Sequence, residues 1–173
     1  TAAPKLTAVS LKETDSGKGG AEYYSNEPQN VYLNSSYTVT YTVEEDNYLS
    51  DAGYVNMDWG ETIAEGEAAD CSLDTRDKAA ITLKVDTRGK QIENAHYCPT
   101  LTVKDKAGNV LVKDASFDNQ GYDYNNVTVD IDGKATMEVC QVLDNVAPVL
   151  DSVKVVKHTG TVIPDYTDAA YIN

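Results

Sequence analysis

An alternating run of tyrosine, threonine and valine at residues 37–43, YTVTYTV, constrains the fold of this chain more than any other stretch. Successive side chains of a β-strand point to opposite faces, so Tyr37 and Tyr41 would share one face with the valines, and the threonines would share the other. Aromatic and β-branched residues also favour strands. The run therefore predicts an antiparallel strand with one buried face and one solvent-facing face.

The same period of two recurs in most other segments. Its apolar members are Val55, Met57 and Trp59, then Ile81, Leu83 and Val85, then Tyr97, Leu101 and Val103, then Val127, Val129 and Ile131, and finally Met137, Val139 and Leu143. Shorter strands are expected at residues 7–11 and 110–112, and turn-forming sequences such as DKAGN (105–109) and DIDGK (130–134) separate the strands. This pattern predicts an all-β, antiparallel sandwich of about 7–9 strands.

Two segments do not alternate. Residues 61–80 are interpreted as a long connection with a helical turn near residues 62–68, and residues 114–125 as an irregular stretch before the final hairpin. The sequence constrains the strand order least in these two places.

Part of the opening sequence recurs near the end of the chain. APKLTAVSLK at residues 3–12 is echoed by APVLDSVKVV at residues 147–156, with Leu6 matching Leu150 and Val9 matching Val153, and YLN at 32–34 returns as YIN at 171–173. Recurrence of this kind is typical of tandem arrays. We expect one module over residues 1–146 and the truncated beginning of a second over 147–173. Its first strand, 149–157, would either fray or pair with a sheet edge in its own chain or in a neighbouring chain, which leaves strand swapping open.

The charge balance disfavours several classes of partner. The chain has 28 Asp and Glu against 14 Lys and Arg, a formal net charge of −14. Such a charge repels phosphate backbones and anionic lipid, so nucleic acid and membrane surfaces are not expected partners. The sequence also lacks an apolar run of the roughly 18 residues that a membrane-spanning helix needs.

Three stretches resemble bacterial immunoglobulin-like repeats. They are LTVKDKAGNVLV at 101–112, YLNSSYTVTYTVEEDNY at 32–48 and LDNVAPVL at 143–150, and their order matches one whole module and its junction with the next. The resemblance implies an immunoglobulin-like β-sandwich in a large secreted or wall-attached surface protein, typically of a Gram-positive bacterium. Such modules act as spacers or adhesive units, so the implied partners are neighbouring modules and a host or environmental glycan or protein.

Acidic residues at the end of one strand and two residues at the module junction form a candidate calcium site. Glu44, Glu45 and Asp46 follow the alternating strand, and Asp144 and Asn145 lie at the junction. Calcium prefers such oxygen ligands, and an ion shared by the two groups at one pole would stiffen the joint. The alternative is ordinary solvated surface charge. No other cofactor is indicated.

Aromatic residues raise a second possibility, a carbohydrate-binding module. Trp59 alternates with Val55 and Met57, which favours a place in the core, but it is also a candidate for a sugar-stacking platform. Tyr122 and Tyr124 are two residues apart and would share a face in an extended chain. Exposed rings would favour the carbohydrate module, and buried rings the spacer.

The cysteines allow at most one disulfide within the chain, and the histidines offer little for catalysis. Cys71, Cys98 and Cys140 contain no CxxC pair. Cys98 and Cys140 both lie on the strand faces opposite the apolar stripes. If the two strands that carry them are neighbours, these cysteines could approach each other. His96 and His158 belong to no recognisable triad, and the many carboxylates single out no acid–base pair, so an enzyme is not expected.

Overall fold

The computed structural model describes residues 2–14, 22–23, 30–45, 54–77 and 80–153. These residues confirm an all-β sandwich, in which the helical content is a single short 3-10 turn, η1, at Asp123–Asn125. They form fourteen strands, more than expected, because several long strands of the sandwich are interrupted partway.

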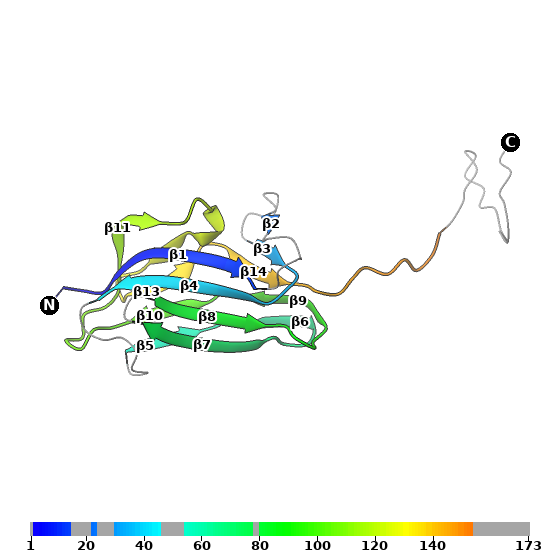
Figure 1. The fold of residues 1–173 in the computed structure, drawn as a ribbon, viewed down its shortest axis with the longest axis horizontal. Coiled ribbons are helices and arrows are strands. Elements are labelled where there is room, and N and C mark those ends of the chain that lie inside the picture. Colours follow the sequence, from blue (N-terminus) through cyan, green and yellow to red (C-terminus); the bar gives the residue numbers. More distant parts are fainter. Residues whose placement is uncertain (1, 15–21, 24–29, 46–53, 78–79, 154–173) are drawn as a thin grey trace.

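One layer is a five-stranded sheet of order β11-β1-β4-β8-β7 (Figure 1). Its strands are β1 (Lys5–Glu13), β4 (Tyr37–Glu44), β7 (Asp70–Asp77), β8 (Ala80–Asp86) and β11 (Val112–Asp118). Neighbours pair antiparallel except β11, which runs parallel to β1. The alternating run is confirmed as β4, with Tyr37, Val39, Tyr41 and Val43 fully buried.

The other layer consists of two small sheets, built from shorter strands, that continue one another. The first has the order β12-β13-β10-β5, with β12 (Val127–Val129), β13 (Lys134–Met137), β10 (Thr100–Val103) and β5 (Val55–Asp58). The second has the order β2-β3-β14-β9-β6, with β2 (Glu22–Tyr23), β3 (Asn30–Leu33), β14 (Cys140–Leu143), β9 (Ile92–Tyr97) and β6 (Thr62–Gly66). Three chain segments, β5–β6, β9–β10 and β13–β14, pass directly from one sheet to the other.

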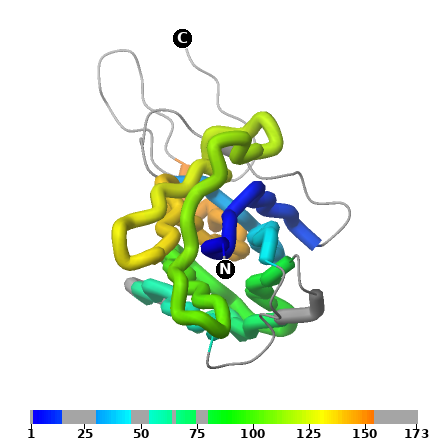
Figure 2. The backbone as a smooth tube through the Cα atoms, turned by 90° about the vertical axis from the view of Figure 1, so that its left-hand side faces the viewer, coloured from blue at the N-terminus to red at the C-terminus, as the bar shows by residue number. Residues whose placement is uncertain are grey.

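The apolar faces of the two layers form one core. Leu6 and Val9 of β1 and the buried side of β4 pack with Tyr97, Leu101 and Leu143 from the other layer. At the end of the sandwich where β1 begins, the chain between β10 and β11 crosses from one layer to the other (Figure 2). Leu111, in this crossing, is also fully buried.

The predicted helical turn at 62–68 is wrong, because the described part of residues 61–80 holds the edge strands β6 and β7 and the start of β8, and is not a long connection. β6 pairs with β9, from a more distant part of the chain, whereas β7 pairs with β8, the next strand along the sequence. Edge strands are partly solvated, and even their apolar members Ile63 and Leu73 are 38% and 37% exposed. Such strands do not need the strict alternation that marks a half-buried one.

Two other segments also differ from expectation, and a third is described only in part. Residues 114–125 hold part of β11 and the 3-10 turn and are thus partly regular. Ile131 does not continue the β12 face, because it lies in the turn between β12 and β13 and is 94% exposed. Residues 149–153, the described part of the predicted strand 149–157, form no strand, and the remainder lies outside the described residues.

A disulfide between Cys98 and Cys140 lies where the two small sheets meet. The S–S distance is 2.04 Å and the Cα atoms are 4.7 Å apart. Thr136 faces Thr100 and Gln141 faces Tyr97, so four residues of one strand (137–140) lie opposite two of the other (98–99). This is a bulge, and the disulfide joins its two sides. The pair is the one that strand adjacency suggested.

Cys71, the third cysteine, is a free thiol on β7 and is half-buried. Burial, together with the nearby Glu61 and Asp70 carboxylates, raises the pKa of this thiol to about 11. The thiol therefore stays protonated at neutral pH and is a poor nucleophile in the folded protein.

Gly60 makes the other close contact at this joint. Asp58 faces Thr100 and Thr62 faces His96, which places Gly60 opposite Cys98. Its φ is +56°, and a Cβ atom there would lie 2.3 Å from the carbonyl oxygen of Cys98. Only glycine fits, because both the dihedral angle and the close backbone approach exclude a side chain.

Gly60→Ala is expected to lower the free energy of unfolding by about 3 kcal/mol, since it combines a left-handed conformation with a backbone clash. Gly89→Ala is the matched control, because Gly89 has a φ of +75° but nothing within 4 Å of the position that a Cβ atom would take. We expect the control to cost about 1 kcal/mol from strain alone. Urea denaturation measures both, and equal losses would contradict the close approach at Gly60.

The DKAGN turn between β10 and β11 is organised by a buried aspartate. The Asp105 carboxylate accepts hydrogen bonds from the Ala107 and Asn109 amides, both at 2.8 Å, and from the Asn109 side-chain amide at 2.6 Å. These bonds, the Asn109 side chain first among them, lower the pKa of Asp105. The charged carboxylate therefore stabilises the fold.

This shift predicts a loss of stability in acid. The pKa of Asp105 is lower in the folded chain, so its contribution is complete above the unfolded value of about 3.9 and disappears as the pH falls through the folded value. Asp105→Asn should flatten the decline of the unfolding free energy below about pH 4. Asp151→Asn, in the exposed tail, is the control. Denaturation at several pH values would refute the role of Asp105 if both variants kept the wild-type slope.

Candidate functional site

The chain enters the sandwich at one end and leaves it at the other (Figure 1). We call these the entrance end, where β1 begins beside the end of β4, and the exit end, where β14 finishes beside Leu33. The features with the most functional interest lie at the exit end, since the next part of the chain starts there.

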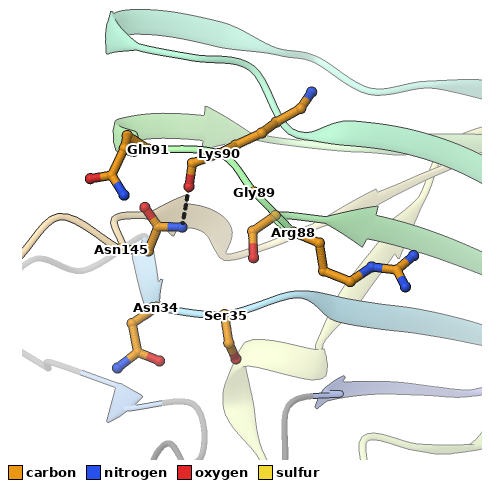
Figure 3. Close-up of a pocket in the computed structure, with 8 residues that line it drawn as sticks. Asn34, Ser35, Arg88, Gly89, Lys90, Gln91 and Asn145 are labelled. Carbon is orange, nitrogen blue, oxygen red and sulfur yellow. Dashed lines mark hydrogen bonds between the residues drawn. The ribbon is translucent and has the colours of Figure 1, made fainter.

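A polar hollow of about 450 Å³ opens at the exit end. It lies between the β3–β4 connection and the β8–β9 turn, and its lining residues are Asn34, Ser35, Thr87, Arg88, Gly89, Lys90, Gln91 and Asn145 (Figure 3). The Arg88 and Lys90 side chains extend away from Asn145, so the main chain of the turn forms much of the wall near this residue. A second hollow of about 340 Å³ shares Arg88.

Asn145 fixes the chain as it leaves the sandwich. Its backbone N–H donates to the Ile92 carbonyl at 2.9 Å, and its side-chain oxygen accepts from the Ile92 N–H at 2.8 Å. Its side-chain nitrogen donates to the Lys90 carbonyl at 3.1 Å (Figure 3). The asparagine therefore continues the β14–β9 ladder for one residue with its side chain.

Asp144 adds two further bonds at the same place. Its N–H donates to the Leu33 carbonyl at 2.9 Å, and its carboxylate accepts from the Val146 N–H at 3.0 Å. Together these bonds hold the main chain as far as Val146. The two junction residues thus have a structural role, and Asn145 in particular is bonded through both ends of its amide.

The charged residues of the β8–β9 turn are already paired. The Arg88 guanidinium bonds to the Asp86 carboxylate, and this contact lowers the pKa of Asp86. The Lys90 ammonium donates to Asp70 at 2.7 Å and to the Ala68 carbonyl at 2.8 Å. The Thr87 N–H donates to the Ser36 hydroxyl at 2.9 Å, which ties the turn to the start of β4. The lining is therefore held in place, with little net positive charge to attract an anion.

The sequence analysis missed the turn at residues 86–91, although a signal for it exists. DTRGK at 86–90 has the same D-x-x-G arrangement as DKAGN and DIDGK, which were both recognised as turns. In all three, the aspartate side chain accepts a hydrogen bond from the backbone N–H two residues later.

The proposed calcium site is not formed, because its two halves lie at opposite ends of the sandwich. Glu44 and Glu45 are at the entrance end, whereas Asp144 and Asn145 are at the exit end. The seven residue-to-residue steps from Tyr37 to Glu44 along β4 separate them by roughly 24 Å, at about 3.4 Å per step. Asp46 lies outside the described residues. Within the described part of the chain, no three His, Cys, Asp or Glu side chains are grouped to hold a metal ion.

The aromatic residues are also separated. Tyr122 and Tyr124 stack, with ring centroids 5.0 Å apart and planes at 19°, and Tyr122 is 54% exposed while Tyr124 is buried. Trp59 is partly buried against the core, as its alternation favoured, and follows β5 at one edge of its sheet. The tyrosines precede β12 at the opposite edge. A single platform containing all three rings is therefore excluded by the strand order.

Comparisons with known proteins do not place the chain in a family. No family model, no curated protein and no solved structure matches it. Among the residues that the structure describes, no helix is long and apolar enough to cross a membrane.

Asn145→Ala should lower the unfolding free energy by about 1–3 kcal/mol, because it leaves the N–H of the buried Ile92 without its acceptor. Hydrogen exchange at the Ile92 amide should accelerate more than the global loss of stability explains. Asn34→Ala changes an exposed residue of the same hollow and should cost less than about 0.5 kcal/mol. If hydrogen exchange at the Ile92 amide were unchanged in Asn145→Ala, the proposed role of the Asn145 side chain in holding this backbone would be contradicted.

Proposed function

We propose that residues 1–146 form a non-enzymatic, immunoglobulin-like spacer module of a secreted or surface-anchored bacterial protein. The proposal starts from the resemblance of the strand, turn and junction sequences to bacterial immunoglobulin-like repeats. It also agrees with a disulfide, which persists in oxidising, extracellular settings.

The course of the chain carries this proposal. β1 starts at the entrance end and β14 finishes at the exit end, so a pull on the two ends of the module acts along the strands (Figure 1). Hydrogen bonds between antiparallel strands are perpendicular to such a pull, and several must break together. The hydrogen bonds of Asp144 and Asn145 hold the main chain at the exit end. This arrangement suits a unit joined end to end with others.

The burial of the repeated segment supports a second module after the first. In the first copy, Leu6 and Val9 are fully buried in β1. In the second copy, the matching Leu150 and Val153 are 80% and 75% exposed, in a stretch that extends from the exit end. The second copy would bury these residues as the first strand of a following sandwich, or by exchange with another chain. Neighbouring modules are thus the proposed partners.

An adhesive role is the second candidate, and one observation favours it. The exposed face of Tyr122, stacked on Tyr124, offers a single aromatic surface of the kind that sugars contact. A glycan or protein bound there would leave the sandwich and its end-to-end course unchanged. The carbohydrate-binding alternative therefore depends on Tyr122 and not on Trp59.

A glycan-array screen of the whole chain separates the two candidates. The spacer predicts no saturable binding and an unchanged Trp59 fluorescence, because Trp59 packs partly against the core. Tyr122→Ala tests any hit, and Ile131→Ala, which removes another exposed apolar side chain, is its control. Saturable binding that Tyr122→Ala abolishes and Ile131→Ala retains would replace the spacer with a carbohydrate-binding module.

A further inference from the structure

The last strand before the chain leaves the module is short and is covalently anchored at its first residue. β14 has four residues, Cys140–Leu143, paired parallel with β3 and antiparallel with β9. Its first residue, Cys140, is bonded to Cys98, which follows β9. A pull on the exit end therefore reaches the disulfide once these few residue pairs have separated.

The disulfide encloses a large part of the module. The separation of Cys98 and Cys140 is 42 positions, which leaves 41 residues between them. The enclosed segment contains β10, β11, η1, β12 and β13. It therefore includes the DKAGN turn and the strand that pairs with the outer side of β1. When the bond between the two sulfur atoms transmits the load, none of these residues lies on the load-bearing path.

We propose that the Cys98–Cys140 disulfide limits the extension of the module, so that residues 99–139 stay free of tension when the chain is pulled from its ends. This inference rests on the proposed spacer function, because it matters only if the module bears load along its axis. An oxidised module would release the residues before Cys98 and after Cys140, and retain the rest. Reduction would convert the same module into a longer tether.

Cys71 lies outside the enclosed segment and does not disturb the bond in the folded state. It is on β7 in the opposite layer and half-buried, and its raised pKa keeps it in the thiol form. Once β7 detaches under load, its thiolate would be free to attack the disulfide and exchange partners. A test of how the disulfide limits extension therefore uses a Cys71→Ser background, in which only the Cys98–Cys140 pair remains.

Single-molecule stretching of the whole chain, held at residues 1 and 173, tests whether the disulfide limits extension. Dithiothreitol supplies the two electrons and two protons that convert the disulfide to two thiols. In Cys71→Ser, its addition should lengthen the unfolding contour by about 15 nm, from 42 positions at roughly 3.6 Å each less the 4.7 Å already spanned by the bond. Cys71→Ser with Cys98→Ser and Cys140→Ser should show the longer contour with or without dithiothreitol. Equal contour lengths for Cys71→Ser with and without the reductant would contradict the proposal that the disulfide limits extension.

The unfolding force tests the spacer function separately. Pulling through residues 1 and 173 loads the strands lengthwise, whereas handles at Ser72 and Ser116, on the exposed edge strands β7 and β11, pull the five-stranded sheet apart from its edges. The spacer function predicts a higher force for the lengthwise pull. A lengthwise force no higher than the edge-to-edge force would refute the load-bearing role, even if the shift of about 15 nm were observed.

Discussion

The meeting point of the two small sheets holds the second layer together. Three strands pass through it, and at that point regular pairing is interrupted by a bulge, a proline at position 99 and a glycine in a left-handed conformation. Gly60 lets the backbone approach Cys98 from one side, and the disulfide fixes Cys140 on the other. The layer faces the core as one surface because this joint keeps its halves aligned.

The strand that leads to the exit end is also held by side-chain contacts. β14 begins at the disulfide and ends at Asp144 and Asn145, so the last strand is fixed at both ends by side chains. Covalent anchoring at one end and amide hydrogen bonds at the other suit a segment that passes load out of the module. The sequence left Asp144 and Asn145 as either calcium ligands shared with Glu44 or ordinary surface residues, and the structure gives both of them hydrogen bonds at a pole remote from Glu44.

The sequence predicted those parts of the fold in which one strand face is buried. β4 alternates because Tyr37 and Tyr41 face the core and the threonines face outward, and the turns at Asp105 and Asp130 follow from side-chain bonds within a few residues. The strands β6 and β7 could not be read in this way, because edge strands need not alternate, and the pairing of β6 with β9 joins strands that are not consecutive in the sequence. The site at residues 86–91 was missed, although its aspartate turn repeats a visible pattern. The separation of Trp59 from Tyr122 depends on strand order, which local periodicity does not contain.

Disulfide mapping tests the account most directly, because both the second layer and the proposed load path depend on one pairing. The chain would be unfolded in the presence of a thiol-blocking reagent, digested without reduction and analysed by mass spectrometry, and a second sample would be treated with the reagent only while folded. The account predicts a cross-linked peptide pair containing Cys98 and Cys140, with Cys71 blocked fully only after unfolding. A cross-link that includes Cys71, or three free thiols in the unreduced protein, would contradict it.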